Sequence, residues 1–104
     1  MQAFEKVGAD VLYAPGLKTL DEVQLVATAV SKPINVLVTL MSDSDVTVDA
    51  LAAAGAKRIS IGGSLAKASY GLAIEGGKEM LSPGQFQWRK WVGMGNDIGK
   101  LLGK

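Results

Sequence analysis

The residues best suited to chemistry in this chain follow a short apolar run at residues 58–61. Gly62, Gly63 and Ser64 come directly after that run and open a helix-like stretch. Backbone N–H groups at the positive end of a helix suit an anion such as phosphate or carboxylate. The same residues could simply form a tight turn with Ser64 as the helix cap. Both interpretations stay open from the sequence, because one arrangement serves either purpose.

A second polar group follows the apolar run at residues 34–39. Thr39 ends that run, and Asp43 and Asp45 lie in the loop after it. Two carboxylates on this loop could help to hold a divalent cation, which prefers oxygen ligands. Alternate acids in a loop are more often solvated turn formers, and we favour that interpretation.

Other polar and aromatic residues have structural explanations. Asp10 and Asn35 stand near the starts of apolar runs, and the start of a barrel strand is the end that serves stability. For Asn35 we favour a hydrogen bond to neighbouring backbone over one inside a barrel. Phe86, Trp88 and Trp91 could stack on a base or sugar, but burial against a helix or another subunit is the better interpretation because no basic groove accompanies them.

Composition narrows the possible functions of the 104 residues. The chain has no cysteine and no histidine, so disulfides, thiolate chemistry and the commonest general base and metal ligand are excluded. A net charge of +1 gives no electrostatic footprint for nucleic acid. No apolar run reaches the ~18 residues of a membrane span. We therefore expect a cytoplasmic protein without nucleic-acid or membrane partners, and no catalytic or metal-ligating residue in this chain.

The elements that must position these groups repeat along the chain. Apolar runs at residues 9–14, 34–39 and 58–61 recur about every 24 residues, with a helix-like stretch between each pair. Residues 7–16 also resemble residues 54–63 at an offset of 47. This rhythm is typical of parallel βα units and predicts an α/β fold. Three such units cannot close a sheet, whereas eight can close a (β/α)₈ barrel.

Helix signals lie between the runs. Thr19 and Glu22 have capping-box spacing before an apolar stripe formed by Val23, Val26, Ala27 and Val30. Thr47 is placed to cap a short helix over residues 48–54. A small-residue helix is expected over residues 65–80, followed by an aromatic tail that breaks near residues 93–96 and ends in a short amphipathic turn.

Three segments together carry a family resemblance: GADVLYAPG at residues 8–16, KPINVLV at 32–38 and RISIGGSLA at 58–66. In order and spacing they resemble the isocitrate lyase / phosphoenolpyruvate phosphonomutase superfamily, over about residues 3–80. The resemblance implies a (β/α)₈ TIM barrel. This chain would supply its last three βα units, strands six to eight, over residues 1–81, with a C-terminal helical extension over residues 82–104.

The resemblance also implies an activity. The parent protein would be a Mg²⁺-dependent lyase or mutase acting on C–C or P–C bonds of small 2-oxo acids or related carboxylates. The family's metal ligands lie on earlier strands, upstream of this chain. Thr39, which matches a family Thr, would line the substrate pocket with Gly62, Gly63 and Ser64. Pro15 and Leu37 stand where 2-methylisocitrate lyases place a Glu and a substrate-binding Asn, which leaves the substrate open.

The resemblance also predicts an oligomeric state, and one alternative function stays open. The family's eighth helix is commonly exchanged between subunits, so we expect a homo-oligomer in which the helix at residues 64–80 is exchanged. The 104 residues alone are expected to be inactive. The alternative is a non-catalytic half-barrel assembly module that pairs its open strand edges with another chain.

Overall fold

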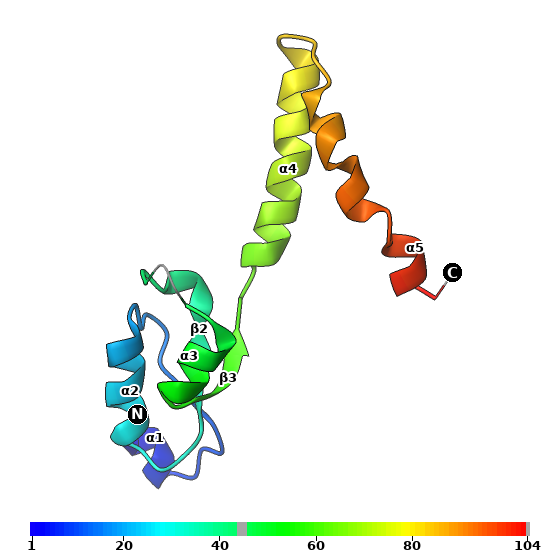
Figure 1. Cartoon of the computed structure of the whole chain (residues 1–104). Helices are drawn as coiled ribbons and strands as arrows, with labels where there is room; N and C mark the ends of the chain where they lie inside the picture. The colour runs from blue at the N-terminus through cyan, green and yellow to red at the C-terminus, as the bar shows by residue number, and fades with distance from the viewer. Residues whose placement is uncertain (44–45, 104) are drawn as a thin grey trace. The chain divides into compact units, whose positions relative to one another are not determined.

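The computed structural model describes residues 1–43 and 46–103. The chain divides into two compact units, Met1–Ser64 and Leu65–Lys104, and each is described by itself (Figure 1). The boundary expected between residues 81 and 82 lies inside the second unit. All four residues expected to line a pocket belong to the first unit.

The first unit alternates strands and helices as the sequence predicts. Its elements are α1 (Gln2–Lys6), β1 (Leu12–Tyr13), α2 (Leu20–Thr28), β2 (Ile34–Leu37), the 3₁₀ helix η1 (Val38–Leu40), α3 (Val48–Ala53) and β3 (Ala56–Ser60). The strands form one parallel sheet in the order β1-β2-β3. Leu12 pairs with Ile34 and Ile34 with Ala56, so each step spans 22 residues, slightly fewer than expected.

The strand bounds differ from the predicted ones because of what each strand can pair with. β1 is limited to the two residues that pair with β2, and Pro15 beyond it has no N–H to extend a ladder. β2 ends at Leu37, where the chain turns into η1 and the Met41 N–H donates to the Val38 carbonyl at 3.0 Å. β3 begins at residue 56, two residues earlier than expected.

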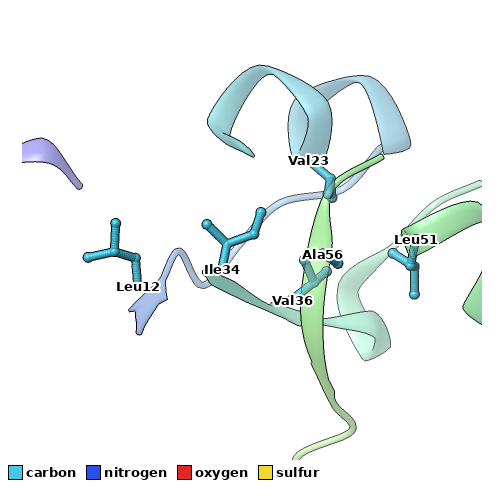
Figure 2. Packing of buried hydrophobic residues seen from close by; sticks show 6 residues of the cluster. All are labelled: Leu12, Val23, Ile34, Val36, Leu51 and Ala56. Carbon is cyan, nitrogen blue, oxygen red and sulfur yellow. The ribbon is translucent and has the colours of Figure 1, made fainter. Parts of the chain in front are cut away.

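A single hydrophobic core lies between the sheet and its helices (Figure 2). Its buried members come from all three strands and from α2 and α3: Leu12, Val23, Ile34, Val36, Leu51 and Ala56. Val26, Ala27 and Val30 of the predicted apolar stripe pack against this cluster. Burial of each large aliphatic side chain stabilises the fold by about 1.5–3 kcal/mol. The core therefore fixes the helices on one face of the sheet.

A β-bulge in β3 determines which of its side chains face the core. The pairing shifts between Ile34 and Asn35, so that Ala56 pairs with Ile34 and Arg58 with Asn35. The extra residue is Lys57. Beyond it, Ile59 packs against the core, and the alternation of side chains places Arg58 and Ser60 on the opposite face. Consecutive parallel strands with right-handed crossovers carry their helices on one side, so the opposite face receives none of these crossover helices.

The predicted helix starts are confirmed. The Thr19 hydroxyl accepts a hydrogen bond from the Glu22 N–H at 3.2 Å, and Thr47 accepts one from the Ala50 N–H at 3.0 Å. The Glu22 carboxylate reaches back to the Lys18 N–H at 2.6 Å. Both helices are thus capped by their own neighbouring side chains.

The second unit contains α4 (Ser64–Leu81), which begins at the last residue of the first unit, then the 3₁₀ helix η2 (Gln87–Gly95) and α5 (Ile98–Leu101). The break expected near residues 93–96 falls at the end of that range, since η2 continues through Gly95 and α5 begins at Ile98. A groove of about 370 Å³ lies in this unit, lined by Leu72, Ala73, Gly76, Gly77, Met80, Trp88, Trp91 and Val92. Phe86 stays 53% exposed. Among the residues described, no helix is long and apolar enough to cross a membrane.

The resemblance between residues 7–16 and 54–63 has a physical basis at two helix ends. Gly8 follows α1 and Gly55 follows α3, with φ angles of 96° and 102°. An Ala at Gly55 would be strained by this φ, and its Cβ would lie 2.5 Å from the Ala27 Cβ. We expect Gly55→Ala to lower the free energy of unfolding by roughly 2 kcal/mol. Urea denaturation measures this, with Gly63→Ala as the control, since a Cβ there meets nothing within 4 Å; equal losses would contradict the prediction.

Glu5 links α1 to the chain after α2. Its Oε1 accepts hydrogen bonds from the Ser31 hydroxyl at 2.6 Å, the Ser31 N–H at 2.8 Å and the Lys32 N–H at 3.0 Å. These bonds, led by the Ser31 hydroxyl, hold the pKa of Glu5 below its ordinary value of 4.5. A lowered folded-state pKa gives stability that is present above the unfolded-state pKa and lost as pH falls through the folded value.

Glu5→Gln should therefore be less stable than the unaltered chain above pH 4.5, and the difference should shrink as the pH is lowered further. Urea midpoints measured across acid and neutral pH test this. Ser31→Ala should act in the same direction because it removes the main hydrogen bond. A difference that does not change with pH would rule out the proposed charge effect.

Candidate functional site

The carboxyl ends of β2 and β3 lie at one rim of the parallel sheet and bring two predicted residues together. Thr39 Oγ1 lies 2.7 Å from the Ile61 carbonyl oxygen, and Ser64 Oγ lies 2.5 Å from the same oxygen. The two hydroxyl oxygens are 3.1 Å apart. Ile61 thus holds both hydroxyls at the rim. Sequence reasoning missed this carbonyl, because a main-chain acceptor has no residue type to reveal it.

The glycines complete the turn between β3 and α4. Gly62 has a φ of 54°, and a Cβ there would lie 3.5 Å from Leu37 Cδ1, whereas a Cβ at Gly63 would meet nothing within 4 Å. The Ser64 N–H donates to the Ile61 carbonyl at 3.2 Å. Ser64 is the first residue of α4, and its hydroxyl also turns back to Ile61. The open side of this turn is therefore at Gly63.

Asp43 accepts a hydrogen bond from the first turn of α2. Its Oδ2 accepts a hydrogen bond from the Leu20 N–H at 2.8 Å, which satisfies one of the unpaired donors in the first turn of α2. This supports the structural interpretation of Asp43. Asp45 lies outside the described residues. Within residues 1–43 and 46–103, no group of three or more His, Cys, Asp or Glu could hold a metal ion. These residues alone do not fit a magnesium site.

Asn35 lies below the rim and differs from expectation. It is 6% exposed, and its Nδ2 donates to the Ser60 hydroxyl at 3.0 Å. The partner is therefore a neighbouring side chain, not backbone. The Asn35 Oδ1 atom is buried and has no partner among the described residues. Asp10 is exposed just before β1, at the end of the strand away from the rim.

A hollow of about 450 Å³ lies away from the rim. It is formed by α2, α3 and the amino-terminal ends of β2 and β3, with Lys32, Pro33, Gly55 and Lys57 among its lining residues. None of the residues expected to bind substrate lines it. The hollow is therefore not part of the candidate site at the rim.

Comparisons with known proteins find similarity over most of the chain. The family model for phosphoenolpyruvate phosphomutase matches residues 1–81. A solved structure from Burkholderia cenocepacia J2315, named as a candidate lyase/mutase, is similar with a TM-score of 0.83 and 39% sequence identity. The match covers 98% of this chain and only 36% of that protein. A search of curated proteins finds no match.

The hydrogen bond from the Thr39 hydroxyl to the Ile61 carbonyl can be tested as the contact that holds the turn at the rim. We expect Thr39→Val to remove its hydrogen bond to Ile61 and to destabilise the turn by about 1 kcal/mol. Amide exchange at Ser64 should then become about fivefold faster, as that energy implies. Thr39→Ser keeps the hydroxyl and is the matched control. Unchanged exchange in Thr39→Val would show that the bond does not hold the turn.

Proposed function

The chain belongs to the phosphoenolpyruvate phosphomutase family, and from that membership we propose that it is one part of a Mg²⁺-dependent lyase or mutase. The reaction would make or break C–C or P–C bonds of small 2-oxo acids or related carboxylates. The observation that carries the proposal is the family match over residues 1–81. The relative from Burkholderia, named as a candidate lyase/mutase and 39% identical, supports the same class.

The proposed architecture is the last three βα units of a (β/α)₈ barrel, strands six to eight, over residues 1–81. Residues 82–104 would extend it. Two features of the first unit support this: the sequential parallel order β1-β2-β3 and the core on one face of the sheet. A doubly wound sheet would carry helices on both faces, whereas a barrel carries them only outside.

The proposed pocket uses the rim of β2 and β3. Gly62 and Gly63 would offer backbone N–H groups to the carboxylate or phosphonate of the substrate, at the positive end of α4. Thr39 and Ser64 would fix that backbone through Ile61 and line the pocket with their hydroxyls. This chain would then bind and orient the substrate.

Mg²⁺ would supply electrostatic stabilisation of an enolate-like oxyanion. The described residues do not form its site, because Asp43 is engaged at Leu20 and no acidic cluster accompanies it. As the family resemblance implies, the proposal places the metal ligands upstream of this chain.

We also propose a homo-oligomer in which the helix at residues 64–80 is exchanged between subunits. The apolar groove of the second unit supports a partner there, since it combines the glycines of α4 with Trp88 and Trp91. The alternative function, a non-catalytic assembly module, is favoured by one observation: β1 and β3 each pair with only one neighbour in the described sheet, which leaves two open edges.

A chimera distinguishes enzyme from module. In the chimera, this chain replaces the matching part of the Burkholderia protein. Turnover of oxaloacetate, 2-methylisocitrate and phosphonopyruvate is then measured with Mg²⁺ present. We expect Mg²⁺-dependent turnover of one substrate by the chimera, and none by the 104 residues alone. The intact relative is the reference and circular dichroism the folding control. A folded chimera that is inactive where the reference is active would favour the module.

A further inference from the structure

Three hydrogen bonds join the chain after β1 to the chain after β2. The Lys18 carbonyl accepts one from the Ser42 N–H at 2.8 Å and one from the Ser42 hydroxyl at 3.1 Å. The Asp43 Oδ2 atom accepts the third from the Leu20 N–H at 2.8 Å. We call these three bonds the loop clasp. Because the clasp joins segments that follow the carboxyl ends of two parallel strands, it lies at the same rim as the candidate site.

The clasp lies at the end of the short segment that carries Thr39. Thr39 is part of η1, and the Met41 N–H closes that turn by donating to the Val38 carbonyl at 3.0 Å. Val38 and Met41 also pack against the core. Ser42 and Asp43 follow Met41 directly. The position of the Thr39 hydroxyl therefore depends on how both ends of this segment are held.

The Asp43 carboxylate makes the strongest bond of the clasp. Hydrogen bonds to an ionised group are roughly twice as strong as those between neutral groups. Asp43 is partly buried, so water competes with its bond less than at an exposed site. Its partner, the Leu20 N–H, lies in the first turn of α2, where a negative charge is favoured. Loss of this carboxylate should therefore loosen the clasp more than loss of the Ser42 hydroxyl.

We propose that Asp43 is a positioning residue of the rim: it holds the end of η1 at the start of α2 and so keeps Thr39 within reach of the Ile61 carbonyl. That carbonyl is followed directly by Gly62 and Gly63, whose N–H groups would bind the anionic group of the substrate. Asp43 thus acts on the pocket without touching the substrate or a metal. The inference rests on the function proposed above, because that function gives the rim its pocket.

Two other roles for Asp43 agree less well with its surroundings. A metal ligand would need further acidic partners, and residues 1–43 and 46–103 contain no group that could hold a metal ion. A role confined to the start of α2 would repeat one that is already filled, because Thr19 caps this helix and Glu22 accepts from the Lys18 N–H at 2.6 Å. What Asp43 adds to these local caps is a connection to the chain after β2.

Amide exchange at Ser64, measured on the full 104 residues, tests this role. The Ser64 N–H donates to the Ile61 carbonyl at 3.2 Å and therefore reports on the turn at the rim. We expect Asp43→Ala to speed this exchange by about threefold, less than Thr39→Val does, because Asp43 acts through Thr39. The double variant should exchange no faster than Thr39→Val alone. Asp43→Asn keeps an oxygen acceptor for the Leu20 N–H and should restore most of the protection.

Glu22→Ala is the matched control. It removes the other carboxylate at the start of α2, one that comes from the helix itself, and should change Ser64 exchange by less than about twofold. Equal effects of Glu22→Ala and Asp43→Ala would overturn the positioning role. Additive effects of Asp43→Ala and Thr39→Val would overturn it too, because Asp43 would then act independently of Thr39.

The chimera with the Burkholderia protein supplies a second readout. There, Asp43→Ala should raise the KM of the substrate more than it lowers kcat, because the rim would bind the substrate and not react with it. Asp43→Asn should leave the Mg²⁺ dependence unchanged, and a need for more Mg²⁺ would identify Asp43 as a metal ligand and overturn the inference. Ser64 exchange is measured without substrate, so unchanged exchange in Asp43→Ala overturns the role of Asp43 alone. An inactive chimera beside an active reference overturns the proposed function instead.

Discussion

The pairing of β2 with β3 is the constraint on which the first unit depends. One extra residue, Lys57, shifts the register between Ile34 and Asn35. A one-residue shift in a strand sends every later side chain to the other face. The bulge therefore lets Ala56 and Ile59 both face the helices, while Arg58 and Ser60 face away. Without it, a guanidinium would point into the apolar core.

The same pairing sets the rim. Because β2 and β3 run parallel, their carboxyl ends lie at one edge, and Thr39 and Ser64 meet at the carbonyl of Ile61. β2 stops early at this point, where η1 carries the chain past the end of the ladder. The Thr39 hydroxyl then bonds to the Ile61 carbonyl just past the end of β3, so the rim is held by side chains where the ladder has ended.

Local signals explain what the sequence could predict. Thr19 and Thr47 mark helix starts, because each acts on backbone within a few residues. The length of β1, the bulge at Lys57 and the bond from Asn35 to Ser60 depend on a neighbouring strand instead. The same reason applies at the rim: its glycines and hydroxyls are visible in the sequence, whereas the Ile61 carbonyl that accepts from both hydroxyls is not.

The proposed barrel explains two features together: the lack of a metal site among the described residues and the open edges of the sheet. Helices and core residues cover one face of the sheet, and on the opposite face the Arg58 side chain is exposed. At the rim, Gly62 and Gly63 would hold an anion in the proposed pocket, and the described residues form no acidic cluster for a metal. In the proposed barrel, the remaining strands would cover this face and would supply acidic ligands at the same rim, so that stability and activity would depend on the same contact.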